Sequence, residues 1–186
     1  ELYEKLGYLD EEDYLVLAGS LPDTMSKSTY MDIMQMLQYN NSKIIVDATG
    51  ELLLNVLPYK PFLIKPNNHE LGNLFGVEVN TREDAVKYAK KLIEKGARNV
   101  LVSMSASGAV MVTEDGDVYE ADAPQGEVKN SVGAGDAMLA GFLAGYIKYE
   151  DFDKAFKLGI CAGSASAFSE EMATRDEVMK LYEENF

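Results

Sequence analysis

The sequence predicts a three-layer α/β/α fold, in which helices cover both faces of a mostly parallel sheet and one antiparallel hairpin comes late in the chain. Short apolar runs alternate with helical patterns, which is typical of parallel sheets. The segments 108–113 and 117–121 flank Glu114-Asp115-Gly116, which is a hairpin signal. The chain has 186 residues, of which 47% are hydrophobic and 26% charged, and it contains no internal repeat or linker. We therefore expect a single α/β domain spanning residues 1–186.

The parallel strands are predicted from apolar runs that end at turn residues. They cover residues 14–18, 43–47, 62–65 and 99–104. Residues 1–13 are mostly acidic and predict a solvated helix and loop. Ser26 is the expected cap of a helix with one apolar stripe, made of Tyr30, Ile33, Met34 and Leu37. Later helices are expected over about 51–57, from the segment Pro66–Leu71 onward, and from Thr81 to a stop at Gly96.

After the hairpin, a loop over 122–129 leads into a glycine-rich turn and a helix that runs to about residue 148. The expected buried stripe of this helix is Leu139, Phe142, Leu143, Tyr146 and Ile147. Two more helices are expected, over about 153–168 and from about Thr174. Parallel strands share one carboxyl edge, where ligands bind. We therefore expect one cleft to be faced by the residues that follow strands, namely Gly19-Ser20, Asp47, Lys65–Asn67 and Ser103.

Composition excludes several classes of function. A net charge of −14 argues against a nucleic-acid partner, because binding to the phosphate backbone depends on clustered Lys and Arg. No apolar run approaches the length of a membrane-spanning helix, and the first residues lack the features of a signal peptide. The single cysteine, Cys161, lies in an apolar segment and is expected in the core. One cysteine cannot form an internal disulfide, so we expect a cytoplasmic protein.

The stretch from Asn130 to Gly145 indicates function most directly. Gly133 and Gly135 permit a tight turn, and the first N–H groups of the following helix lack intrahelical partners, which suits a phosphate. Asp136 at this junction would repel a bound anion, but it makes sense as a base that takes a proton from an attacking hydroxyl. The alternative is a helix start with a favourable first-turn Asp and glycines that permit close packing.

Asn67 and Glu70 have the spacing of a capping box at the start of a helix, and this structural role is sufficient to explain them. A P-loop, a dinucleotide-binding glycine motif and a Cys/His metal site are all absent from the sequence. His69 is given no role. Lys129, before the glycine turn, is expected to be solvated, although it could also neutralise phosphate charge.

These motifs resemble, in order and spacing, those of the ribokinase-like (pfkB-type) sugar kinases from about residue 12 to 168. Within that family the chain looks most like the bacterial 1-phosphofructokinase and tagatose-6-phosphate kinase branch. The resemblance implies ATP and Mg²⁺ as cofactors and a ketohexose monophosphate, fructose 1-phosphate or tagatose 6-phosphate, as the substrate. The alternatives are a kinase of another sugar or a nucleoside on the same fold, and a nucleotide-binding module without turnover.

Residue roles are carried over from the family only where the motifs match. Asp136 would be the catalytic base, with the N–H groups of the turn as the anion hole, which comprises Gly133, Ala134, Gly135 and Asp136 itself. The residues expected to bind the nucleotide are Lys65, Asn67, Glu70, Ser103 and Gly108. Asn67 and Glu70 would also order Mg²⁺ through water. Ser105 stands where the family usually has glycine. Family members are longer, and a small β-sheet lid that often forms a dimer contact precedes the matching region, so a homodimer of the complete protein is one expectation.

Overall fold

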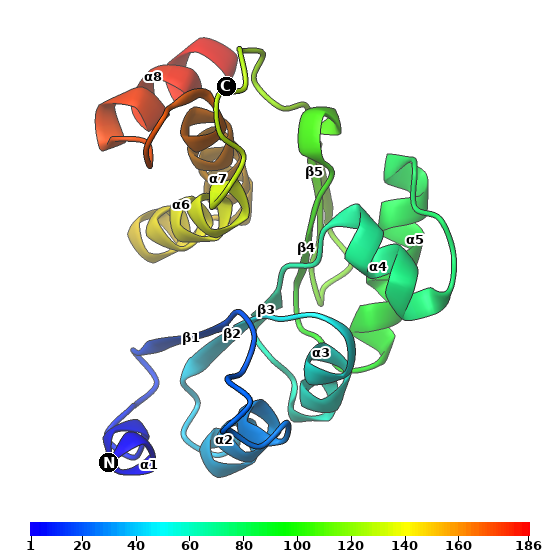
Figure 1. Ribbon diagram of the computed structural model, residues 1–186, viewed down its shortest axis with the longest axis vertical. Coiled ribbons are helices and arrows are strands. Elements are labelled where there is room, and N and C mark those ends of the chain that lie inside the picture. Colours follow the sequence, from blue (N-terminus) through cyan, green and yellow to red (C-terminus); the bar gives the residue numbers. More distant parts are fainter. The chain divides into compact units, whose positions relative to one another are not determined.

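A computed structural model describes all residues, 1–186, as a mixed α/β protein (Figure 1). The chain divides into two compact units. Unit 1 comprises Glu1–Val102 with Met111–Val118, and unit 2 comprises Ser103–Val110 with Tyr119–Phe186. The expectation of a single domain therefore stays a prediction, and each unit is described by itself.

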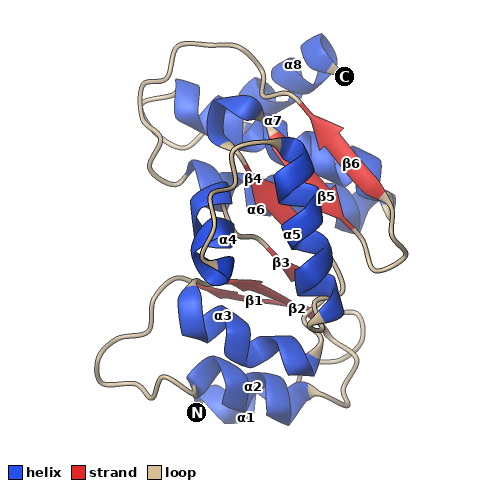
Figure 2. Ribbon diagram, turned by 90° about the vertical axis from the view of Figure 1, so that its right-hand side faces the viewer, coloured by secondary structure: helices blue, strands red, loops and turns tan.

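The strands form one six-stranded sheet in the order β1-β2-β3-β4-β5-β6. Their bounds are β1 (Tyr14–Ala18), β2 (Lys43–Asp47), β3 (Leu63–Ile64), β4 (Val100–Ser103), β5 (Ala109–Val112) and β6 (Val118–Ala121). The first four strands are parallel, and β1 pairs with β2 over its whole length, from Tyr14 opposite Lys43 to Ala18 opposite Asp47. The mostly parallel sheet with a late antiparallel hairpin is confirmed (Figure 2).

Five helices belong to unit 1: α1 (Leu2–Leu6), α2 (Thr29–Leu37), α3 (Gly50–Val56), α4 (Asn68–Phe75) and α5 (Arg82–Glu94). Neighbouring parallel strands that follow one another in sequence are joined by right-handed crossovers, and such crossovers place α2 to α5 on the same side of the strands (Figure 1). The strand residues between them are excluded from water, with Ile45, Val46, Leu63 and Ile64 all fully buried. The core of unit 1 thus fixes the carboxyl ends of β1, β2 and β3.

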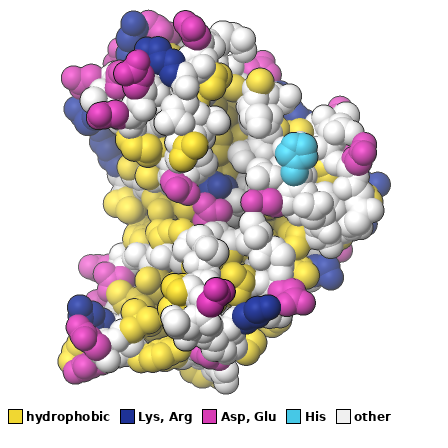
Figure 3. All heavy atoms as spheres, viewed as in Figure 1, with side chains coloured by type: hydrophobic (Ala, Val, Ile, Leu, Met, Phe, Trp, Pro, Cys, Tyr) yellow, Lys and Arg dark blue, Asp and Glu magenta, His cyan; other side chains and the backbone are white.

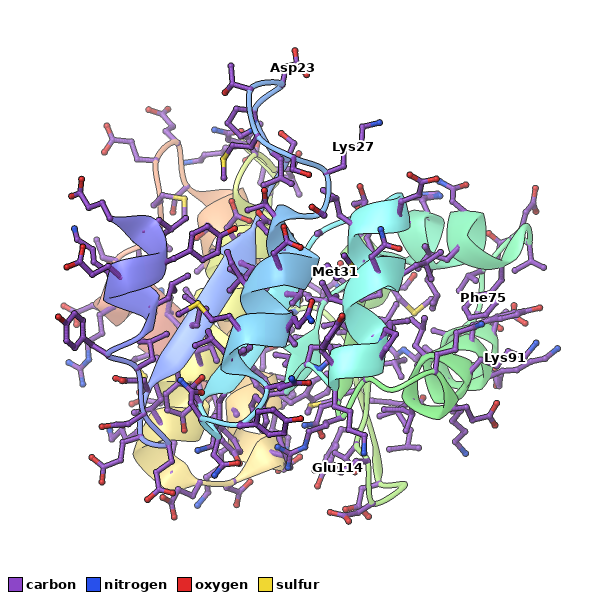
Figure 4. The ribbon with its side chains drawn as sticks, turned by 90° about the horizontal axis from the view of Figure 1, so that it is seen from below. Asp23, Lys27, Met31, Phe75, Lys91 and Glu114 are labelled. Carbon is purple, nitrogen blue, oxygen red and sulfur yellow. The ribbon has the colours of Figure 1, made fainter.

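An aromatic and cationic contact joins α4 to α5. The rings of Phe75 and Tyr88 lie 5.1 Å apart between centroids, and the ammonium of Lys91 lies 4.8 Å from the Tyr88 centroid. Figure 4 shows the side chains of Phe75 and Lys91 beside each other. This contact links the end of α4 to the middle of α5.

Three helices belong to unit 2: α6 (Ala134–Tyr149), α7 (Phe152–Phe168) and α8 (Arg175–Asn185). The helices α6 and α7 pack closely through small residues. A Cβ atom added at Gly141 would lie 2.5 Å from the Cβ of Ala162, and one added at Gly145 would lie 2.8 Å from the Cα of Ala155. Cys161 is fully buried, as expected, and burial raises the pKa of its thiol to about 12.

Several predicted details differ from the structure. The helix α2 begins after Ser28, and Ser26 instead accepts a hydrogen bond from the Ser28 N–H, so Ser26 is not the cap. Ile147 is 55% exposed, although the helical period placed it in the buried stripe of α6. Pro58 lies within a 3₁₀ turn (η1, Leu57–Tyr59) that continues α3, and a second such turn is η2 (Ser105–Ser107).

None of the helices combines the length and the apolar composition that a membrane-spanning segment requires. On the face shown in Figure 3, acidic side chains are scattered among the basic ones, in keeping with the net charge of −14.

Candidate active site

In unit 1, the ends of neighbouring strands bring Asp47 and Lys65 together. Asp47 is the last residue of β2 and Lys65 follows β3, and Lys65 Nζ lies 3.2 Å from Asp47 Oδ2. The two side chains are only 7% and 15% exposed, respectively. The N–H of Gly19, which follows β1, donates to the Asp47 carbonyl at 3.0 Å. Gly19, Asp47 and Lys65 therefore lie together at one edge of the sheet within unit 1, and the cleft that they were expected to face stays a prediction.

Tyr30 also contributes to this edge, which the sequence did not indicate. The sequence placed Tyr30 only in the buried apolar stripe of its helix, but the Tyr30 hydroxyl donates a hydrogen bond to the Ala18 carbonyl at 2.7 Å. Burial raises the pKa of Tyr30, and the negative charge of Asp47 raises it further. The hydroxyl therefore remains a donor and holds the end of β1 against α2.

The capping box at the start of α4 is fully formed. Asn67 Oδ1 accepts from the Glu70 N–H at 2.8 Å, and Glu70 Oε2 accepts from the Asn67 N–H at 2.9 Å. The structural interpretation of this motif is thus confirmed, and it uses only one of the two Glu70 carboxylate oxygens. No group of three or more His, Cys, Asp or Glu side chains is placed to hold a metal ion. The available oxygens suit a hydrated Mg²⁺, which keeps several of its waters, better than a closed protein cage.

The last residue of β4, Ser103, and the loop that follows it, which contains Gly108, belong to unit 2. The Met104 N–H donates to the Gly108 carbonyl at 2.8 Å. Gly108 has φ +83°, and a Cβ atom there would collide with the Ala121 carbonyl. Packing alone thus explains this glycine, and the nucleotide contacts of Ser103 and Gly108 stay predictions.

Ser105, which replaces the usual glycine of this loop, has φ +51°. This left-handed conformation is unfavourable for a residue with a Cβ atom. The departure from the family pattern therefore lies at a position where the backbone itself favours glycine.

The glycine turn begins α6 with unpaired N–H groups. Gly133 is the N-cap with φ +78°, and no side chain caps the helix. The Ala134 N–H donates weakly to the Ser131 carbonyl, at 3.3 Å. The N–H groups of Gly133, Gly135 and Asp136 donate to no protein atom. These three donors and the positive end of the helix dipole make a site suited to an anion.

Asp136 lies in the first turn of α6 and its side chain is exposed. An exposed carboxylate beside unpaired N–H groups is available to a ligand rather than committed to the fold. The structure thus brings Asp136 together with the turn in unit 2 and brings Asp47, Lys65, Asn67 and Glu70 to the strand ends of unit 1.

Proteins of similar sequence are sugar-phosphate kinases by name. The 1-phosphofructokinase of Bacillus subtilis is 46% identical over 181 residues, which are 97% of this chain and 59% of the relative. The D-tagatose-1-phosphate kinase of Bacillus licheniformis is 33% identical, over 97% of this chain and 59% of the relative. The chain therefore spans about three fifths of the length of these curated relatives.

Solved structures of sugar kinases resemble this chain in fold. Phosphofructokinase-2 from Escherichia coli in complex with substrates and products superposes with a TM-score of 0.91 at 27% identity, covering 99% of this chain and 61% of that one. The ribokinase of Arabidopsis thaliana, at 20% identity, shares the fold with a TM-score of 0.79 over 91% of this chain and 55% of that one. Residues 1–177 match the family described as pfkB family carbohydrate kinase. The chain belongs to the pfkB family of carbohydrate kinases.

Proposed function

We propose that the complete protein transfers the terminal phosphoryl group of ATP to a hydroxyl of a ketohexose monophosphate, giving a sugar bisphosphate and ADP. The observation that carries the proposal is the turn at Gly133–Asp136, where an exposed carboxylate adjoins three unpaired N–H groups at a helix N-terminus. Membership of the pfkB family supports the same reaction class.

In this proposal Asp136 acts as the general base. Its carboxylate accepts the proton of the attacking sugar hydroxyl, and general bases typically contribute about 10²–10⁴-fold to a rate. The N–H groups of Gly133, Gly135 and Asp136 face the charge that develops on the transferring phosphoryl group. Because these donors are already oriented by the helix, they require no reorganisation during the reaction.

The capping box of α4 is proposed to orient a hydrated Mg²⁺. Glu70 retains one carboxylate oxygen that the cap does not use, and the cap fixes where this oxygen lies. When bound, Mg²⁺ neutralises charge on the nucleotide phosphates. Lys65 is the proposed phosphate contact in unit 1, and its ammonium lies beside the carboxylate of Asp47.

The names of the relatives favour an acceptor that carries its phosphate on C1. One relative is named 1-phosphofructokinase and another D-tagatose-1-phosphate kinase. We therefore place fructose 1-phosphate first and a tagatose phosphate second. The Escherichia coli phosphofructokinase-2 has also been crystallised with fructose 6-phosphate, which makes that sugar a third acceptor to test.

The oligomeric state of the complete protein is proposed by analogy with a similar solved structure. A tetrameric form of Escherichia coli phosphofructokinase-2 is similar to this chain, at 27% identity and a TM-score of 0.89. We propose that the complete protein is a homo-oligomer, with the dimer as its simplest form. We also propose a cytoplasmic location, because the single cysteine, Cys161, is free and buried, as is usual in a reducing compartment.

The test measures ADP release by the complete gene product with each acceptor, beside calorimetric titration with ATP. Rapid ADP release with fructose 1-phosphate and little with unphosphorylated fructose supports the proposal. ATP binding without ADP release from any sugar phosphate would instead identify a nucleotide-binding module without turnover. Preference for a nucleoside or a free sugar would assign another kinase activity on the same fold.

A further inference from the structure

We infer that the end of α7 and the residues that follow it form a platform that sets the position of the catalytic turn, with Phe168 and Met172 as positioning residues. The platform is defined as Ser166–Met172. The inference rests on the proposed function, because it assigns these residues to the same turn that carries Asp136. All of the contacts that support it lie within unit 2.

Backbone hydrogen bonds attach the approach to the turn to α7. The carbonyl of Ala167 accepts from the N–H of Lys129 at 2.8 Å and from that of Asn130 at 3.1 Å. Ala167 is the second-last residue of α7, where helix carbonyls lack intrahelical partners. Asn130 Oδ1 in turn accepts from the Val132 N–H at 3.0 Å. The chain is therefore tied to α7 immediately before Gly133.

Side-chain packing makes the same connection. A Cβ atom added at Gly126 would lie 2.5–2.7 Å from three ring atoms of Phe168, so the loop backbone lies directly on this ring. No left-handed φ is found at Gly126, so the close approach of the ring, and not the backbone conformation, explains the glycine. Met172 Sδ would lie 3.2 Å from a Cβ atom at Gly133, which places the thioether against the turn itself.

The first residue of α6 also rests on α7. A Cβ atom at Gly163 would lie 3.0 Å from the Ala134 carbonyl and 3.2 Å from the Met138 Cβ. The chain thus contacts α7 or its extension before the turn, at the turn and after it. A displacement of the platform would move Asp136 and its neighbouring N–H groups together.

Hydrogen bonds hold the platform itself. Ser166 Oγ accepts from the Ala173 N–H at 3.3 Å, and Ser169 Oγ donates to the Ala165 carbonyl at 3.0 Å. The helix α8 then begins with a capping box formed by Thr174 and Glu177. The pKa of Glu177 is lowered, mainly because its carboxylate accepts a hydrogen bond from the Thr174 N–H. The nearby positive charge of Lys129 also lowers it. The segment is therefore ordered on both sides of Met172.

Because phosphoryl transfer depends on the alignment of the reacting groups, a shift of about 1 Å at the turn can cost on the order of 10²-fold in rate. The test uses the complete gene product and the variants Gly126→Ala, Phe168→Ala and Gly126→Ala/Phe168→Ala. In Gly126→Ala the new methyl group clashes with the Phe168 ring and displaces the loop that contains residue 126. The double variant removes this ring and therefore the clash. Gly7→Ala is the matched control, since Gly7 is in unit 1 and has a right-handed φ of −67°.

We expect Gly126→Ala to lower kcat by about 10- to 100-fold, with a change of less than about twofold in the KM for ATP. We also expect the amides of Lys129 and Asn130 to exchange hydrogen faster than in the wild type. Phe168→Ala is expected to lower kcat less, and the double variant to recover most of the kcat that Gly126→Ala loses. Gly7→Ala should change neither quantity.

The inference would be overturned if Gly126→Ala left both kcat and the hydrogen exchange of the Lys129 and Asn130 amides unchanged. It would also be overturned if kcat of the double variant fell by the product of the two factors measured for the single variants. If Gly126→Ala does not fold, Phe168→Leu is used in its place. Wild-type values of kcat and of amide hydrogen exchange at Lys129 and Asn130 in that variant would also overturn the inference. The exchange measurement needs no catalysis, so it tests the platform even if Asp136 proves not to be the base.

Discussion

The ammonium of Lys65 lies 3.2 Å from the carboxylate of Asp47, and both side chains are almost fully buried. A buried ammonium is costly unless it is paired. The contact therefore explains how unit 1 keeps a lysine at the carboxyl edge of its sheet.

Replacing Asp47 with Asn is expected to lower the free energy of unfolding by about 3–5 kcal/mol, because it leaves the ammonium of Lys65 buried without its counter-charge. Urea unfolding of Asp47→Asn, Lys65→Met and the double variant measures the effect. The double variant should be more stable than Asp47→Asn alone, since it removes both charges. Wild-type stability of Asp47→Asn would show that the ion pair is not required for the fold.

The capping box allows the structural and metal roles of Glu70 to be separated. Glutamine can also accept at this position of a capping box, so Glu70→Gln should retain nearly all of the stability. The loss of negative charge should nevertheless raise the Mg²⁺ concentration needed for half-maximal activity. Asn67→Ala is the comparison, and it should lose about 1 kcal/mol through the cap. A Mg²⁺ dependence of Glu70→Gln that matches the wild type would remove Glu70 from the metal site.

Ser105→Gly is expected to stabilise the protein by about 1 kcal/mol, because glycine adopts the left-handed backbone found at this position at little cost. Thermal unfolding measures the gain. Asn41→Gly is the matched control, since Asn41 has a similar φ of +60° but asparagine tolerates that conformation well. A fall in the melting temperature of Ser105→Gly would show that the serine side chain stabilises the loop more than its backbone strains it.

The free edge of β1 predicts association of residues 1–186 when they are produced alone. The strand β1 is the terminal strand of the sheet, and Val16 is 42% exposed. Unpaired strand edges with apolar side chains favour pairing between copies. Sedimentation velocity should show a concentration-dependent oligomer that Val16→Lys reduces. A monomer at all concentrations would argue that this edge does not pair.

Much of the fold follows from local patterns, because apolar runs, turn residues and capping motifs act over a few positions. The strands, the hairpin and the Asn67–Glu70 cap are examples. Other features depend on contacts between residues distant in sequence, and no local signal marks them. The ring of Phe168 contacts Gly126, and the Ala167 carbonyl accepts from the Lys129 and Asn130 N–H groups, although the whole of α6 lies between these partners in the sequence. The hydroxyl of Tyr30 is another case, since its partner Ala18 ends a separate strand.

The central claim is that Asp136 is the base of a phosphoryl transfer, and the most direct measurement is the steady-state kcat of Asp136→Asn in the complete protein with fructose 1-phosphate. Asparagine has nearly the same shape as aspartate but cannot accept the proton. We predict a fall in kcat of about 10²–10⁴-fold while the calorimetric Kd for ATP stays near its wild-type value. A kcat close to that of the wild type, with ATP bound normally, would contradict the assignment of Asp136 as the catalytic base.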